Sequence, residues 1–502
     1  MWFHKPQKDG NMRIGKFLTM ATVPMMLLAC SDDNSGFSSN PSSEEPVEQP
    51  KNDSIPPNTP DSLLKPITRD FSLIWKGEGS AENPYQVASE ADLISLAFYV
   101  NDSSMSFRDK HFVQTSDIAL TKPWSPIGIF GTNAYGYGNR PFSGIYDGGA
   151  KSISGLTISD TARYSGLFGL TRGAQLKNVV IKGAKMDVGS YAGVLAGMTD
   201  STVVENCNIE NAEIKGNDRV AGLIGEASYV TVTNVSVTGS VTGTNSVGGV
   251  LGSVQNVTMT GLTNKATVSG KATVGGIAGA SASVGDESVI TNALNYGAVT
   301  GTKDVGGLFA TLSNSKLEKS GNNGVVTADS SDRGSVGGAV AVVSNKSVVN
   351  EVYNAAKVTV KKLPTAGGVI GNTKSTVVVT NVFNHGELSG KANNMGGLVG
   401  LIEGDAKLQS AYNKGVIPNE NYAGTVAGNF TSSTAMANVF YDKTVGGTCL
   451  VVAKYMDMQL PTGVESTEMK AAAFITQLGS AEGVWTNDPA AFDGYPIFTW
   501  MK

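Results

Sequence analysis

Cysteine, histidine and charge are scarce in this sequence. Its 502 residues include only 3 Cys and 3 His, and 16% of the residues are charged. So little cysteine excludes a disulfide scaffold or a cysteine-rich zinc module. His4 lies in a predicted signal, and the remaining His111 and His385 are too few for a multi-histidine metal site. The net charge of −5 provides no electrostatic footprint for nucleic acid. We therefore expect no metal, no cofactor and no nucleic-acid partner.

A membrane-spanning apolar run is also missing. The N-terminal apolar run, residues 17–29, has 13 residues, fewer than the roughly 20 that a spanning helix needs. This run follows a basic stretch that contains Lys5, Lys8, Arg13 and Lys16. A basic region, a short apolar run and a small residue before the cleavage point are typical of a secretory signal. We predict a signal peptide over residues 1–29.

The end of this signal resembles a bacterial lipobox, Leu27-Leu28-Ala29-Cys30. The resemblance implies that Cys30 is lipidated and anchors the chain to a membrane without a spanning helix. Ser31-Asp32-Asp33 resembles the surface-export signal of lipoproteins in some diderm bacteria, which implies an outer-membrane lipoprotein facing the cell exterior. The alternative is an ordinary signal with a chance cysteine. Residues 30–70 are rich in Ser, Pro and Glu, so we predict a disordered tether.

Glycine is abundant, with 61 residues, well above the usual share of about 7%. Much of it belongs to one phrase: a small or apolar residue, Gly, two apolar residues, then Gly or Ala. Ten copies follow one another, and their second residues are 27 to 31 positions apart. These repeat glycines are Gly166, Gly193, Gly222, Gly249, Gly276, Gly307, Gly338, Gly368, Gly397 and Gly424.

Between the glycines lie short runs rich in Val and Thr, punctuated by Asn and Gly, which predict about three short strands per repeat. So few strands cannot enclose a core alone, but stacked coils can. We therefore predict an all-β, right-handed parallel β-helix solenoid over residues 166–440, with about ten coils and short capping helices at both ends. Each repeat glycine would either adopt a positive φ or allow close backbone approach. A β-propeller would require longer repeats in fewer copies.

The repeated phrase resembles the GLUG motif, which recurs in bacterial surface proteins and in IgA-specific peptidases. The segments Trp75–Val87, Trp124–Gly128 and Phe142–Gly149 resemble the first coils of such proteins, so the resemblance covers residues 71–502. It implies a surface β-helix of the adhesin type. The His-Glu-x-x-His signature of zinc peptidases is absent from the sequence.

Both ends of a solenoid require caps, because open coils expose strand edges. Residues 71–165 are expected to form an N-terminal cap and the initial coils, with a helix that begins near Ser89. Its predicted buried residues are Leu93, Leu96, Ala97 and Val100. Residues 441–502 are expected to form the C-terminal cap, with a helix from Thr467 to Leu478 that ends at Gly479.

Two columns of equivalent residues suggest sites. One consists of Asn178, Asn206, Asn234, Asn292, Asn350, Asn381 and Asn438, with departures at Gly261, Lys319 and Ser410. Stacked Asn side chains can hydrogen-bond from coil to coil, so we predict a structural ladder, with ligand binding as the alternative. The other consists of Tyr353, Phe383, Tyr412 and Phe440. Facing outward, these rings would form a stripe suited to sugars or partner chains; facing inward, they would be core.

No catalytic residue is predicted. Polysaccharide-degrading β-helices rely on clustered acids with Arg or Lys, whereas Arg163, Arg172, Arg219 and Arg333 fall at unrelated repeat positions. We predict a lipid-anchored surface protein that binds an extracellular glycan or protein without catalysis. The alternatives are a polysaccharide lyase or hydrolase whose acids come from different coils, and a purely structural stalk.

Overall fold

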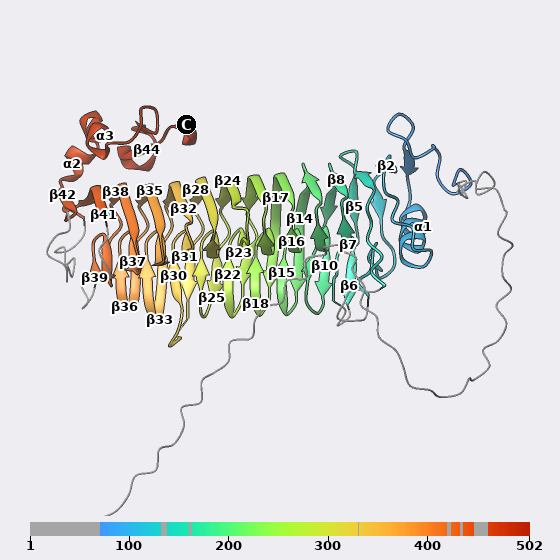
Figure 1. Ribbon diagram of the computed structural model, residues 1–502, viewed down its shortest axis with the longest axis horizontal. Coiled ribbons are helices and arrows are strands. Elements are labelled where there is room, and N and C mark those ends of the chain that lie inside the picture. The colour runs from blue at the N-terminus through green and yellow to red at the C-terminus, as the bar shows by residue number, and fades with distance from the viewer. Residues whose placement is uncertain are drawn as a thin grey trace, which may run out of the picture. The chain divides into compact units, whose positions relative to one another are not determined.

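The computed structural model describes residues 71–131, 138–159, 163–329, 331–418, 423–431, 435–445 and 460–502. The predicted signal peptide, Cys30 and the tether lie outside these residues. The described chain is all-β and forms a parallel β-solenoid of about 12 turns (Figure 1). This confirms the predicted fold class.

One face of the solenoid is a ten-stranded parallel sheet, whose strands begin at the fourth or fifth residue of the repeated glycine phrase. These strands are β7 Phe168–Arg172, β12 Ala196–Asp200, β16 Ile224–Ser228, β19 Leu251–Gln255, β23 Ala278–Ala282, β27 Phe309–Ser313, β31 Val340–Ser344, β34 Ile370–Lys374, β37 Val399–Ile402 and β40 Ala427–Phe430.

The other faces are one continuous set of 32 strands. In chain order they are β1 Tyr85–Val87, β2 His111–Gln114, β3 Ile118–Ala119, β4 Ile145–Asp147, β5 Ser152–Ser154, β6 Thr157–Ser159, β8 Gln175–Lys177, β9 Val180–Lys182, β10 Lys185–Asp187, β11 Ala192–Gly193, β13 Val203–Glu205, β14 Asn208–Lys215, β15 Asp218–Ala221, β17 Thr231–Thr242, β18 Asn245–Gly248, β20 Thr258–Asn264, β21 Thr267–Ser269, β22 Ala272–Gly275, β24 Ser288–Asn295, β25 Val299–Gly301, β26 Val305–Gly306, β28 Ser315–Asn322, β29 Val326–Ala328, β30 Ser335–Gly337, β32 Val348–Asn354, β33 Val358–Gly367, β35 Val377–Asn384, β36 Leu388–Gly396, β38 Ala406–Asn413, β39 Ala423–Gly424, β41 Ala435–Asp442 and β42 Thr462–Val464.

Successive coils stack in register, so each position of the repeat becomes a column along the solenoid. Val352 pairs with Val382, which pairs in turn with Ala411. These three side chains are fully buried in one core that runs from the N-terminal cap to the last coil. Inward Val, Leu and Ile therefore supply the apolar burial that no single coil could achieve.

A buried ladder of asparagines runs inside the coils. Each side-chain Nδ2 donates to the Oδ1 of the next Asn at 2.8 or 2.9 Å, and also to a backbone carbonyl two residues on. The ladder therefore satisfies amides that would be costly to bury alone. Its members are Asn264, Asn295, Asn322, Asn354, Asn384 and Asn413.

This inner ladder explains six of the ten repeat glycines. A Cβ added to Gly338 would lie 2.0 Å from the carbonyl oxygen of Gly368 and 2.4 Å from Cγ of Asn354. Gly249, Gly276, Gly307, Gly368 and Gly397 face a ladder Asn in the same way. None of these glycines has a positive φ. Close approach, rather than a positive φ, is therefore the reason for Gly at this position.

Helix α1 (Glu90–Asn101) lies at the N-terminal end of the coils (Figure 1). The Ser89 hydroxyl caps it by accepting a hydrogen bond from the Asp92 amide at 3.3 Å. Its four buried residues are those predicted, and they join the core of the coils. This buried face closes the N-terminal end of the core.

The C-terminal segment, residues 460–502, differs from the prediction. Instead of one helix from Thr467, two short helices form, α2 (Ser466–Met469) and α3 (Ala472–Leu478). Gly479 ends α3 at a φ of 64°, as expected. Strand β43 (Trp485–Asn487) then pairs antiparallel with β44 (Pro496–Phe498), and short 3₁₀ helices cover Phe492–Gly494 and Thr499–Met501. Of the helices in the described residues, none is long and apolar enough to cross a membrane.

Candidate functional site

The aromatic column of the last coils faces outward but is covered. Tyr353, Phe383, Tyr412 and Phe440 alternate with inward core residues. The first three rings stack coil upon coil, and Phe440 packs on Phe474 of the C-terminal segment. The C-terminal segment packs on them through Met469, Phe474, Leu478, Trp485, Ile497 and Phe498, so that the four rings are at most 7% exposed. Figure 1 shows this segment lying alongside the last coils. Of the two alternatives, the structure therefore favours a core role over a ligand-binding stripe, because covered rings cannot receive an external ligand.

His385 is buried in the same interface. Its Nε2 lies 2.8 Å from the Tyr412 hydroxyl, which donates its only proton to the Pro496 carbonyl at 2.5 Å. Neutral His385 therefore donates from Nε2. Burial, and to a smaller extent Lys414, lowers the pKa of His385 to about 3, while Asp493 opposes the shift.

This burial predicts acid sensitivity. Between about pH 6.5 and pH 3 the unfolded chain binds a proton at His385 that the folded chain does not. The free energy of unfolding therefore decreases as the pH is lowered, by up to about 1.4 kcal/mol per pH unit. We expect urea unfolding of His385→Phe, followed by circular dichroism, to show a flatter pH dependence than wild type between about pH 6.5 and 4.5. Equal slopes for the two proteins would contradict this assignment.

The predicted outer Asn column lies at tight turns of the coils. Asn178, Asn206 and Asn234 have φ near 55°, and their side chains bond in series at 3.4 and 3.2 Å. Asn292, Asn381 and Asn438 share this φ, as do the departures Gly261, Lys319 and Ser410. The prediction was wrong for Asn350, because Glu351 occupies the turn position in that coil. Asn is favoured here because it tolerates left-handed backbone, which gives the column a structural role.

A different aromatic column is exposed in the first coils. Tyr164, Tyr191 and Arg219 occupy equivalent positions of successive coils. The Tyr164 ring stacks on Phe130 and on Tyr191, with centroids 4.5 Å apart in both pairs. All four side chains are partly exposed. The sequence did not indicate this column, because aromatic residues do not recur regularly along it. One of its three coil positions holds Arg219, and Phe130 lies before the first repeat.

Two arginines complete what we call the tyrosine–arginine cluster, which consists of Phe130, Arg163, Tyr164, Tyr191, Asp218, Arg219 and Glu226. The Arg163 guanidinium lies over Tyr191 at 4.9 Å and over Tyr164 at 5.5 Å from the ring centroids. The Arg219 guanidinium lies 4.8 Å from the Tyr191 centroid. The sequence placed these arginines at unrelated positions, yet both contact one ring because Arg163 precedes the column and Arg219 belongs to it.

Arg219 is neutralised within the cluster and Arg163 is not. Arg219 pairs with Asp218 at 2.5 Å and with Glu226 at 2.9 Å. Burial raises the pKa of Glu226, Arg219 opposes that shift and Asp218 adds to it. Arg163 is exposed, and none of the described carboxylates forms an ion pair with it. Its guanidinium edge is therefore open to a ligand.

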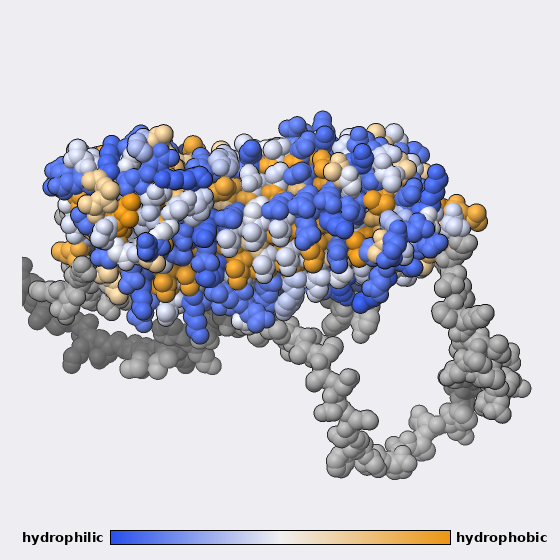
Figure 2. All heavy atoms as spheres, turned by 90° about the horizontal axis from the view of Figure 1, so that it is seen from above, coloured by the Kyte–Doolittle hydropathy of each residue, from blue (hydrophilic) through white to orange (hydrophobic). Residues whose placement is uncertain are grey.

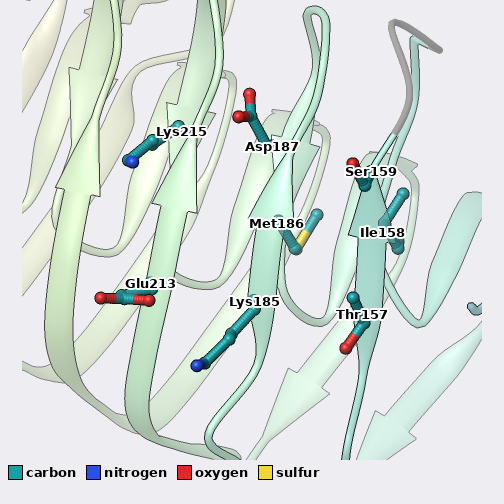
Figure 3. A pocket seen from close by; sticks show the side chains of 8 residues that line it. All are labelled: Thr157, Ile158, Ser159, Lys185, Met186, Asp187, Glu213 and Lys215. Carbon is teal, nitrogen blue, oxygen red and sulfur yellow. The ribbon is translucent and has the colours of Figure 1, made fainter.

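A shallow hollow of about 160 Å³ lies on the same coils, on the outer face of strands β6, β10 and β14 (Figure 3). Lys185 and Glu213 form one row across these strands, and Asp187 and Lys215 form the next. Ile158 and Met186 lie beneath them in the core. The hollow is smaller than the roughly 300 Å³ or more of a small-molecule pocket.

A polar column continues from this hollow along the solenoid. The position of Asp187 and Lys215 is occupied in the following coils by hydroxyl residues that are all at least partly exposed. They are Thr242, Ser269, Thr300, Thr327, Thr359 and Ser389. With strands about 4.8 Å apart, an extended ligand would meet one hydroxyl per coil. Figure 2 shows a second view of the surface, with polar residues over most of it and apolar residues scattered among them.

The chemistry of the cluster is that of ion pairs and hydrogen-bonding groups. Among the described residues, no three His, Cys, Asp or Glu side chains gather as metal ligands. The two acids of the cluster are engaged by Arg219 rather than poised as a free acid and base. What the cluster presents outward is tyrosine edges, hydroxyls and the Arg163 guanidinium, which are hydrogen-bonding groups.

No known family model matches this chain. Halomucin of Haloquadratum walsbyi is 30% identical over 173 residues, which make up 33% of this chain and 2% of that protein. A protein of Evansella cellulosilytica, named as a proposed Gly-rich membrane protein, is 28% identical over 203 residues, or 34% of this chain and 23% of that protein. The chain thus spans less than a quarter of each of these relatives.

Among solved structures, that of a proposed immunoglobulin A1 protease from Bacteroides ovatus shares 16% identity with this chain. The match covers 85% of this chain and 95% of that one, at a TM-score of 0.31. At that score the likeness adds nothing to the assignment of fold or function.

Proposed function

We propose that this chain is a lipid-anchored, surface-displayed β-helix protein that binds an extracellular glycan or protein without transforming it. The observation that carries the proposal is the exposed tyrosine–arginine cluster beside a hollow and a long polar column. A site spread over several coils suits an extended polymer. The lipobox at Cys30 and the names of the two relatives support a surface location.

The runner-up is a polysaccharide-active enzyme. One observation favours it: Asp218 and Glu226 converge on Arg219, and burial raises the pKa of Glu226. Carboxyl groups with raised pKa act as general acids in many glycosidases. The engagement of both acids by one arginine argues against it. A purely structural stalk would have no use for Arg163 held on two tyrosines.

The test displays the full chain on cells and measures capture of labelled mucin, pectin, xylan and collagen. We expect the wild type to partition with membranes and to capture at least one polymer. Cys30→Ala should release the chain from membranes, whereas Tyr191→Asn should stay anchored and lose capture about tenfold, because Tyr191 contacts both arginines.

The matched control is Tyr229→Asn. Tyr229 is 58% exposed and has a φ of 55°, close to the 63° of Tyr191, but it belongs to no ring stack in the described chain. Equal losses in both variants, or capture of none of the polymers, would refute the proposed binding function. Shortening of pectin or xylan by the purified protein, with or without Ca²⁺, would establish the enzyme instead.

A further inference from the structure

The tyrosine–arginine cluster has little free ring face. Tyr164 lies between Phe130 and Tyr191, at interplanar angles of 14° and 25°. Tyr191 lies between Tyr164 and the Arg219 guanidinium. A neutral sugar usually binds an aromatic residue by packing the apolar face of the sugar ring on an open face of the aromatic ring. Here the stack itself uses the faces of Tyr164 and Tyr191 and one face of Phe130, so the two tyrosines offer a ligand little open ring face.

The groups that remain available to a ligand are the N–H donors of Arg163 and the edges of the aromatic rings. Aromatic ring edges carry the positive part of the ring quadrupole. The Arg163 guanidinium rests on two rings, which fixes its plane and leaves its N–H edge free. A planar guanidinium of this kind binds carboxylate or sulfate-type oxygens with paired hydrogen bonds. The complementary ligand is therefore anionic.

We propose that the tyrosine–arginine cluster binds the carboxylate or sulfate groups of an acidic polysaccharide, with Arg163 as the residue that contacts the anion. This inference rests on the proposed binding function and specifies its ligand. Arg219, already paired with two acids, positions Tyr191 beneath Arg163 rather than contacting the anion.

The neighbouring surface favours a polysaccharide over an acidic protein. Six of the eight residues that line the hollow are polar or charged. The column from Thr242 to Ser389 offers hydroxyls at every coil, which suits a hydroxyl-rich chain. A protein partner would instead need a well-packed apolar pocket for an aromatic or aliphatic anchor, whereas polar and charged residues make up most of the lining of this hollow.

The experiment measures the affinity of the purified chain for polygalacturonate and dextran sulfate, and for their neutral counterparts, methyl-esterified polygalacturonate and dextran. We expect wild type to bind at least one acidic polymer about tenfold or more tightly than its neutral counterpart. The polymer preferred shows whether carboxylate or sulfate is the anion. Arg163→Gln should abolish the preference, and Arg163→Lys should retain part of it because the charge remains without the planar fork.

The control is Arg172→Gln, which removes an equally cationic exposed arginine that pairs with Asp200 at 3.0 Å and contacts no aromatic ring of the cluster. This variant should keep the preference. An equal loss in Arg172→Gln, or equal wild-type affinity for acidic and neutral polymers, would overturn the inference. If wild type bound neutral polymers as well as acidic ones, and this binding depended on Tyr191, the proposed binding function would stand but the inferred preference for anions would not. If it bound no polymer at all, both proposals would fail. Full competition by polyglutamate would disprove the choice of a polysaccharide.

Discussion

Gly338→Ala should destabilise the solenoid by more than about 4 kcal/mol or prevent folding. The new methyl group would lie 2.0 Å from the Gly368 carbonyl oxygen and 2.5 Å from the Asn354 amide nitrogen. Neither atom can move away, since Gly368 belongs to the neighbouring coil's backbone and Asn354 is tied to Ala356 and Asn384 by hydrogen bonds. Urea unfolding followed by far-UV circular dichroism measures the effect.

Gly183→Ala is the matched control. It introduces the same methyl group at a position with nothing within 4 Å, so its only cost is a φ of 62°. A non-glycine residue at such a φ costs about 1 kcal/mol. A similar loss in the two variants would show that close packing against the inner Asn ladder is not what the repeat glycine provides.

Asn354→Leu is expected to cost about 4 to 6 kcal/mol although the two side chains have the same number of heavy atoms. The change removes the hydrogen bonds that Asn354 donates to the Ala356 carbonyl and to Asn384. It also removes those that Asn354 accepts from the Ala356 amide and from Asn322. Each buried partner left unpaired costs about 1 to 3 kcal/mol, and the gain from a buried leucine offsets only part of that. The same urea titration measures it, and resistance to limited proteolysis reports whether the coils remain closed.

The outer Asn column provides the comparison. Asn206→Gly removes exposed bonds of 3.4 and 3.2 Å but keeps a residue that accepts a φ of 54°. We expect a change within about 1 kcal/mol. If the outer variant were as damaging as Asn354→Leu, burial of the inner ladder would not be the source of its importance.

The two Asn columns show where sequence reasoning succeeds and where it stops. Both repeat at nearly the same step, so periodicity alone cannot tell them apart. The predicted column marks a turn with positive φ, and the inner ladder lies within the coil beside the glycines. The available signal was the Asn that stands two residues before a small residue, as in Asn354 to Ala356 and Asn384 to Gly386. Side-chain direction, which the structure supplies, decides which column is buried.

The aromatic column of the last coils gives a second lesson. Alternation with Val352, Val382, Ala411 and Val439 predicted that these rings leave the coil interior, and they do. A ring that points out of the coil is exposed only if no other part of the chain covers it. Here residues 460–502 pack on these rings and form a second apolar cluster with them. No local pattern announces where a distant segment docks.

The repeated pattern of glycine, valine and threonine determined the β-solenoid, its coil boundaries and the buried face of α1, because each coil obeys the same short-range geometry and stacking only multiplies it. Tertiary structure alone decided which surface is free. It brought Arg163, Tyr191 and Arg219 together from different coils and covered Tyr353 to Phe440 with the C-terminal segment. Contacts between distant segments depend on chain direction in space, which local periodicity does not encode.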